Sequence, residues 1–279
     1  MFTDSFPENL SELVDGGQDP YTRQELDDSI IYAKRIQDGM MLKEKHLHRI
    51  FPESFIYMRP RNIVSGDFYW FTRLGNKAII AAADCTGHGI PGALMSILGI
   101  NLLNQIIIEE KNTDPSFILH RLDHKVRKAF SYTTDILDEQ FSKEHNDGMD
   151  IALCCIDMDT KVMKFAGAYR PVYYVRDGEL CEMKGSRHPI GGSGSETLFT
   201  NFTLPLEKGD SIYLCSDGYA SQFGYLIDKK FSSGRMKDLL LEIHNRPFAQ
   251  QKTMLEKVFM SWKLQQEQTD DVLVMGFKV

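Results

Sequence analysis

The feature that most constrains the fold of this chain is a series of strand pairs joined by very short turns. Each pair consists of two runs rich in aliphatic or aromatic residues on either side of a turn. The pairs are 63–72 with 77–83, 151–157 with 162–168, and 171–176 with 179–183. The last pair flanks Asp177-Gly178, one of the stronger short hairpin signals. Turns this short join antiparallel neighbours, so the sequence predicts antiparallel sheets.

Helical patterns occur in pairs and do not follow every strand. The helical segments are 93–109 with 115–130, and 233–244 with 248–264. Further strand-like runs at 198–204, 211–215 and 272–279 give a strand count that suits two packed sheets better than one open sheet. We therefore predict an α+β fold with two packed antiparallel β-sheets flanked by pairs of helices. Segments 132–146 and 191–195 are expected to be loops.

We divide the chain into a weakly ordered extension at 1–22, a helix at 23–50 and a domain at 51–279. The helix carries an imperfect heptad stripe of Leu26, Ile30, Ala33, Gln37, Met40, Glu44 and Leu47. Two interpretations stay open for it. In the first, it is a dimerising or signal-receiving helix, and dimerisation would make the protein a homodimer. In the second, it packs on its own domain.

Composition excludes several classes of function. The 279 residues carry 32 basic and 39 acidic side chains, a net charge of −7, which argues against nucleic acid or an anionic membrane as partner. Five cysteines without a disulfide spacing, and no secretory signal, indicate the cytoplasm. The apolar stretch 90–108 has polar interruptions, so we expect a buried core helix and no membrane insertion.

Four aspartates lie at the edges of strand-like runs, each close to glycine or a second acidic residue. They are Asp67, Asp217 and Asp270, and also Asp84, whose nearest glycine is Gly87, three residues later. Ionised carboxylates that converge in one cleft repel one another unless cations neutralise them. Hard ions such as Mg²⁺ or Mn²⁺ suit these ligands, and a pair of them can activate water and clamp phosphate oxygens. We expect Asp84 to bridge two ions, with Asp67 on one and Asp217 and Asp270 on the other.

The residues around these aspartates resemble a known family. The motifs are Ser65-Gly66-Asp67-Phe68-Tyr69-Trp70, Ala83-Asp84-Cys85-Thr86-Gly87-His88-Gly89-Ile90-Pro91-Gly92-Ala93, Ser216-Asp217-Gly218-Tyr219 and Gln268-Thr269-Asp270-Asp271-Val272. Together they are similar to the bacterial sporulation-stage-II-E branch of the PP2C-type metal-dependent protein serine/threonine phosphatases. The resemblance runs from about residue 29 to residue 279.

This resemblance implies a β-sandwich with helices outside and a binuclear Mn²⁺ or Mg²⁺ centre. It implies that the metal ligands are Asp67, Asp84, the Cys85 carbonyl, Asp217 and Asp270. Of the pair Asp270-Asp271, only the first aligns with a ligand of the family.

Other side chains are candidates for proton transfer or phosphate binding. His88 lies four residues after Asp84 and either acts as an acid or braces the loop. Arg61, six residues before Asp67, could offer a guanidinium to phosphate, and Arg170 is a second candidate. The alternative for both arginines is a solvated surface position or an ion pair.

Rival functions are weaker. Cys181 and Arg187 have the spacing of thiolate phosphatases, but Cys181 falls in an expected hairpin strand and not in a phosphate-binding loop. A two-metal nuclease would need a basic stripe, which this acidic chain lacks. A phosphatase-fold adaptor that only binds a partner protein is the alternative we retain, although all four ligand positions are aspartate.

We therefore expect a cytoplasmic Mn²⁺- or Mg²⁺-dependent protein phosphatase that attacks phosphorus directly with metal-activated water. The substrate is expected to be a phosphoprotein, and the resemblance suggests an anti-sigma-factor antagonist. The helix at 23–50 would relay an upstream signal to the domain.

Overall fold

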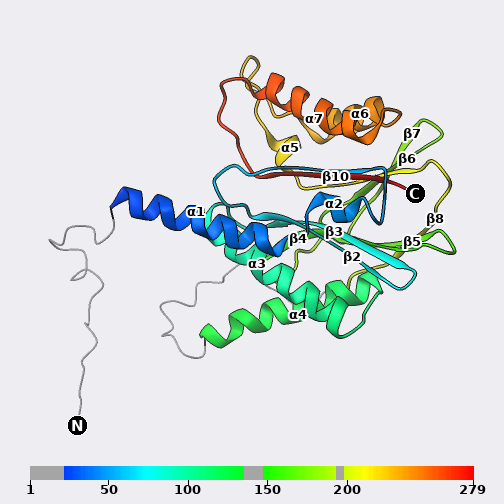
Figure 1. Ribbon diagram of the computed structural model, residues 1–279, viewed down its shortest axis with the longest axis horizontal. Coiled ribbons are helices and arrows are strands. Elements are labelled where there is room, and N and C mark those ends of the chain that lie inside the picture. Colours follow the sequence, from blue (N-terminus) through cyan, green and yellow to red (C-terminus); the bar gives the residue numbers. More distant parts are fainter. Residues whose placement is uncertain (1–21, 135–146, 193–197) are drawn as a thin grey trace, which may run out of the picture.

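The structure is a computed structural model that describes residues 22–134, 147–192 and 198–279. Two five-stranded sheets pack face to face at its centre, and all neighbouring strands are antiparallel (Figure 1). The first sheet has the order β1-β10-β9-β6-β7 and consists of β1 (Ser54–Arg59), β6 (Val172–Arg176), β7 (Glu179–Met183), β9 (Ser211–Cys215) and β10 (Val272–Lys278). The second has the order β2-β3-β4-β5-β8 and consists of β2 (Asp67–Leu74), β3 (Lys77–Cys85), β4 (Met149–Asp157), β5 (Val162–Ala168) and β8 (Phe202–Pro205). The predicted fold class is confirmed.

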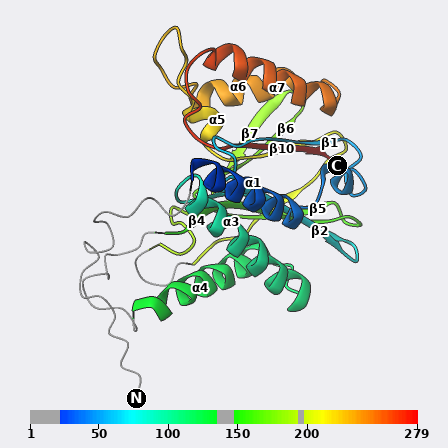
Figure 2. The same ribbon diagram turned by 60° about the vertical axis from the view of Figure 1, so that its left-hand side comes forward.

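Helices cover the outer face of each sheet (Figure 2). Over the first sheet lie α5 (Gly218–Ser221), α6 (Ser233–Ile243) and α7 (Phe248–Lys263). Over the second lie α3 (Ile90–Leu103), the π-helix η2 (Asn104–Glu109) and α4 (Pro115–Thr134). The protein therefore has four layers, with helices outside and the two sheets inside.

The alternation of side chains in β3 shows how one strand serves two layers. Ile79 and Ala81 pack toward the helices, whereas Ala78, Ile80 and Ala82 pack in the layer between the sheets. Successive residues of a strand point to opposite faces, so a strand that is covered on both faces is apolar at nearly every position.

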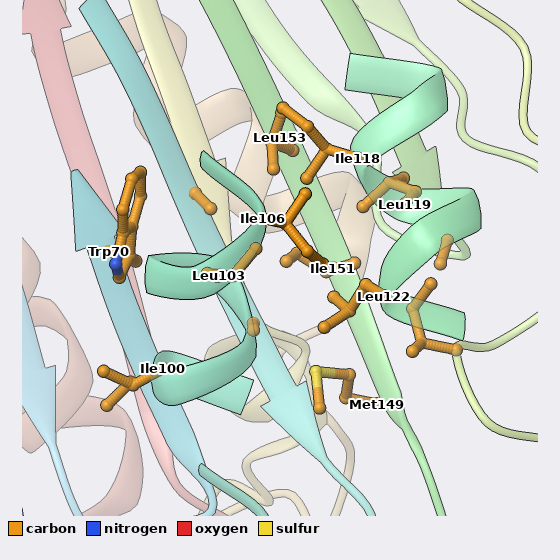
Figure 3. Packing of buried hydrophobic residues seen from close by; sticks show 14 of the residues in the cluster. Trp70, Ile100, Leu103, Ile106, Ile118, Leu119, Leu122, Met149, Ile151 and Leu153 are labelled. Atoms are coloured by element: carbon orange, nitrogen blue, oxygen red, sulfur yellow. The ribbon is translucent and has the colours of Figure 1, made fainter. Parts of the chain in front are cut away.

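The segment Ile90–Glu109 is long and apolar enough to cross a membrane by length and composition, and it is the one such helix among the residues described. In the structure it lies on the second sheet. Ile100, Leu103 and Ile106 are buried there with α4, as Figure 3 shows. This placement agrees with the expected core helix.

The segment at 23–50 differs from the single helix that we expected. It forms α1 (Arg23–Met40) and α2 (Glu44–Leu47), with extended backbone at Met41 and Lys43 between them. The break follows from tertiary contacts, because Met41 is buried in the core and the Glu44 carboxylate accepts a hydrogen bond from Ile56 N at 2.9 Å.

Other boundaries moved by a few residues. The strand expected from residue 63 begins at Asp67, because residues 60–66 form the loop that leads into the site described below. The strand expected from residue 198 begins at Phe202. The loops expected at 132–146 and 191–195 lie mostly outside the described residues, and 132–134 belong to α4.

Substitutions in the Ile90–Glu109 segment test this packing. Ile106 is completely buried, so Ile106→Ala should lower the free energy of unfolding by about 2–5 kcal/mol through lost burial and a cavity. Leu94 on the same segment is 62% exposed, so Leu94→Ala should change it by less than about 0.5 kcal/mol. Urea unfolding of both variants measures the difference, and equal losses would contradict the packing.

Candidate metal centre

Strand register places three aspartates in a row at one end of the second sheet. Asp67 in β2 is paired with Asp84 in β3, and Asp84 is paired with Asp150 in β4. Residues directly opposite one another in antiparallel strands have side chains on the same face. Asp84 continues the alternation of Ile80 and Ala82, so this face is the one between the two sheets.

The first sheet contributes two further aspartates at the same end of the sandwich. Asp217 follows β9 and Asp270 precedes β10, and these strands are antiparallel neighbours whose ends meet. Gly218 permits the close approach, because a Cβ on it would lie 1.8 Å from the carbonyl oxygen of Asp271. The glycine of the Ser-Asp-Gly motif is therefore required by packing.

Ser216 joins the two sheets at this point. Its hydroxyl donates to Asp67 Oδ2 at 2.6 Å and accepts from the backbone N–H of Leu273 at 2.9 Å. Both Asp67 and Ser216 are buried. A buried carboxylate of one sheet is thus held by the backbone of the other through a single hydroxyl group.

Asp271 has a different role from Asp270. It is 3% exposed, and its two carboxylate oxygens accept hydrogen bonds from Arg61 N at 2.6 Å and Gly66 N at 2.7 Å. These bonds fix the loop that leads into Asp67. Asp271 therefore holds this loop in place.

Glycines let the segments around Asp67 and Asp84 come together. A Cβ on Gly66 would lie 2.7 Å from the carbonyl oxygen of Gly87, and a Cβ on Gly92 would lie 2.3 Å from the same atom. The Cys85 side chain is buried in the core on the helix side of β3. Its carbonyl oxygen is near Gly66, at 3.4 Å from the position that a Cβ there would take.

Arg170 lies among the carboxylates. Its Nη2 is 2.7 Å from Asp150 Oδ2, 3.6 Å from Asp84 Oδ2 and 3.7 Å from Asp217 Oδ2. The predicted ion-pair alternative for Arg170 is therefore the state that the structure shows. Asp150 was missed by the sequence analysis, because it becomes visible only through the pairing of β3 with β4, two strands separated by helices in the sequence.

Burial raises the pKa of four carboxyl groups in this cluster. Burial, together with the neighbouring Asp84, raises the pKa of Asp67 well above its ordinary value. Burial raises the pKa of Asp84 to about 8 despite Arg170, with Asp217 and Asp270 adding to the rise. The pKa values of Asp150 and Asp270 are also raised, mainly by burial. Burial opposes the charge of Arg170, but Asp84, Asp217 and Asp150 raise its pKa.

The remaining candidates lie at the edge of the cluster or away from it. Arg61 is exposed, and its charge acts on Asp270, whose pKa it lowers against the larger effect of burial. His88 is exposed on the loop before α3 and has no hydrogen bond or ion pair within the described part of the chain. The structure thus brings the four predicted aspartates and Arg170 together, but does not connect His88 to them.

The thiolate alternative is not supported by the structure. Cys181 lies within β7, directly opposite Tyr174 of β6. Because it belongs to a regular strand, it is not in a loop whose backbone N–H groups could surround a phosphate.

The donor set fits a hard divalent cation. Five aspartates and the Cys85 carbonyl supply oxygen, which Mg²⁺ and Mn²⁺ prefer. As the side chains stand, no group of three or more histidines, cysteines or acidic residues in the described ranges is arranged to hold a metal ion. Asp84, Asp150 and Asp217 point at the Arg170 guanidinium instead. The ligand assignment therefore remains a prediction.

Comparison with known proteins finds a family model and a curated relative that match this chain. Residues 75–279 match the family model described as stage II sporulation protein E (SpoIIE). The phosphoserine phosphatase RsbU of Bacillus subtilis is 29% identical over 163 residues, which are 57% of this chain and 44% of that protein. The chain thus corresponds to less than half the length of this curated relative.

Solved structures resemble the whole fold. The SiaA-PP2C domain of Pseudomonas aeruginosa has a TM-score of 0.80 and 29% identity, over 92% of this chain and 98% of that one. The PP2C phosphatase domain of SpoIIE from Bacillus subtilis, with a fragment of its regulatory domain, has a TM-score of 0.63 and 21% identity over 81% of this chain and 63% of that one. The second likeness concerns the fold alone.

The raised pKa of Asp84 predicts the pH dependence of stability without metal. The folded protein retains this proton up to about pH 8, whereas the unfolded chain loses it near its ordinary value of 3.8. The folded state then binds more protons, so stability in EDTA should fall between about pH 5.5 and about pH 8. Asp84→Asn should flatten this decrease in thermal melting experiments. Asp159→Asn, at an exposed carboxylate in the β4–β5 turn, should keep it, and parallel profiles for all three proteins would contradict the assignment.

Proposed function

Because this chain belongs to the stage II sporulation protein E family of PP2C-type serine/threonine phosphatases, we propose that it removes phosphate from phosphoserine or phosphothreonine in a phosphoprotein with two Mn²⁺ or Mg²⁺ ions. One observation carries the proposal. Asp67 and Asp84 from one hairpin, and Asp217 and Asp270 from two other segments of the chain, converge at one end of the sandwich.

The arrangement of the cluster supports Asp84 as the shared ligand. Asp217 and Asp270, from the first sheet, raise the pKa of Asp84. The Asp84 carboxylate in turn raises the pKa of Asp67, its neighbour in the second sheet. When bound, two divalent ions would activate water for attack at phosphorus and neutralise phosphate charge. No covalent phosphoenzyme is needed.

The chain's own residues would fix the geometry of the reaction. Ser216 orients Asp67 through its hydroxyl group, and Asp271 holds the 60–66 loop through Arg61 N and Gly66 N. The exposed side chain of Arg61 can bind the entering phosphate at the rim of the site. His88 remains a candidate acid.

The substrate and the cellular setting are also part of the proposal. The relative RsbU is named a phosphoserine phosphatase, which supports a phosphoprotein substrate, with an anti-sigma-factor antagonist as the first candidate. All five cysteines are free, which supports a reducing compartment such as the cytoplasm. The adaptor alternative would be favoured by degenerate ligand positions, and these positions are all aspartate.

Metal removal and ligand substitution test the activity. With Mn²⁺, the protein should release phosphate from an aryl phosphate and from a phosphoserine protein, and EDTA should abolish the release. Asp84→Asn should lower the rate by about a hundredfold or more, because a bridging ligand affects both ions. Cys181→Ser is the control and should keep the activity. Activity that survives chelation, or is lost in Cys181→Ser, would refute the metal-dependent mechanism.

We also propose that α1 receives an upstream signal. The Gln37 side chain is completely buried, and its Nε2 donates to Ser65 O at 2.6 Å and to Ser96 Oγ at 2.9 Å. Ser65 precedes the Gly66-Asp67 pair, and Ser96 belongs to α3, which begins soon after Asp84. A displacement of α1 would therefore reach both metal-binding segments.

A homodimer through α1 would use the face that the domain leaves uncovered. On this helix Tyr32 and Ile36, one turn apart, are exposed. If this face forms the dimer, the protein sediments as a dimer, and the double variant Tyr32→Glu, Ile36→Glu sediments as a monomer. A monomeric parent protein across a wide concentration range, or a dimer that persists in the variant, would rule out this interface.

A further inference from the structure

The backbone around Arg170 forms a tight turn that neighbouring glycines pack against. Tyr169 has a positive φ of 54°, and the N–H of Arg170 donates back to Ala168 O at 2.6 Å. Such a backbone conformation is strained for a residue other than glycine. Two glycines pack against the Arg170 carbonyl oxygen, since a Cβ would lie 2.3 Å from it on Gly167 and 2.8 Å from it on Gly185. The guanidinium is therefore directed into the cluster from a fixed base.

The contacts of this guanidinium are of two kinds. With Asp150 it forms hydrogen bonds, from Nη2 at 2.7 Å and from Nε at 3.2 Å, both to Oδ2. With Asp84 and Asp217 it forms ion pairs at 3.6 and 3.7 Å, beyond hydrogen-bond distance. The close contact is thus with the one carboxylate of the three that is not an expected metal ligand.

We propose that Arg170 is an internal counter-ion that competes with divalent cations for Asp84 and Asp217, while Asp150 keeps the guanidinium in the site. This inference rests on the proposed metal centre and adds a residue that sets its affinity. Without a cation, Arg170 offsets the repulsion among the carboxylates and keeps the two sheets together at this end. With cations bound, it gives up the two longer contacts and retains Asp150.

This role has a distinctive energetic sign. If Arg170 only positioned the ligands, its removal would weaken metal binding by the protein, because pre-organisation is lost. A competing charge has the opposite effect, because its removal leaves the carboxylates with more uncompensated negative charge. The direction of the change in metal affinity therefore separates the two roles.

The test is direct measurement of Mn²⁺ binding by the signal of free Mn²⁺ in electron paramagnetic resonance. Arg170→Met replaces the charge with an unbranched side chain and should tighten Mn²⁺ binding by about tenfold, a usual size for coupled binding events. Its melting temperature should fall in EDTA and recover with saturating Mn²⁺. Arg170→Lys keeps the charge and should bind Mn²⁺ within about threefold of the parent protein.

Arg176→Met is the matched control. Arg176 forms a comparable pair with the buried Asp210, at 2.6 and 3.0 Å, but at the opposite end of β6 from the site. Its removal should lower the melting temperature equally with EDTA and with Mn²⁺, and should leave Mn²⁺ affinity unchanged.

Asp150→Asn tests the tether. Without this partner the guanidinium is held only by Asp84 and Asp217, so Mn²⁺ should bind more weakly than to the parent protein. In the Arg170→Met background the same substitution should have a much smaller effect. An equal loss in both backgrounds would show that Asp150 acts on the metal directly.

The outcomes separate this inference from the proposed function. If the parent protein binds no Mn²⁺, the metal centre itself is wrong. If it binds Mn²⁺ but Arg170→Met binds equally or more weakly, the counter-ion role is overturned and the metal centre stands. If Arg170→Met does not fold, Mg²⁺ titration of the parent protein tests the role. The titration should shift the nuclear magnetic resonance signal of the Arg170 Nε–H group. This signal is identified by its loss in Arg170→Lys. An unshifted signal would overturn the role.

Discussion

Carboxylates from both sheets meet at one end of the sandwich, and their mutual repulsion opposes the packing that brings them together. Asp67, Asp84 and Asp150 come from adjacent strands of one sheet, and Asp217 and Asp270 come from the other. A site of this kind is stable only if something supplies positive charge or protons. The raised pKa of Asp84 and the central place of Arg170 are two responses of the same fold to this constraint.

The rest of the local structure holds the segments in place against that repulsion. Both carboxylate oxygens of Asp271 accept hydrogen bonds from the 60–66 loop, and Ser216 connects Asp67 to the backbone of the opposite sheet. Because glycine has no side chain, the loops can approach one another closely at these positions. The helix α1 is connected to the same segments through Gln37, so the regulatory proposal and the metal proposal concern one structural unit.

Much of this could be predicted from the sequence, because its signals are local. The turn at Asp177-Gly178 fixes a hairpin, and Gly66, Gly92 and Gly218 in the aspartate motifs mark places where backbones approach closely. What could not be predicted depends on contacts between distant segments. Asp150 gains its place from the pairing of β3 with β4, and the break between α1 and α2 follows from the burial of Met41. For Arg170 an ion pair was only an alternative to phosphate binding, because nothing near it in the sequence reveals three carboxylates around it.

The central claim is that the meeting point of the two sheets binds a pair of divalent cations. A crystal structure of the Mn²⁺-loaded protein, with an anomalous difference map recorded for manganese, measures this directly. The account predicts two manganese peaks about 3.5–4 Å apart, with the Asp84 carboxylate between them. It also predicts Asp67 on one ion, and Asp217 and Asp270 on the other. Manganese peaks elsewhere, or an Arg170 guanidinium that still contacts Asp84 and Asp217 with no manganese between the sheets, would contradict it.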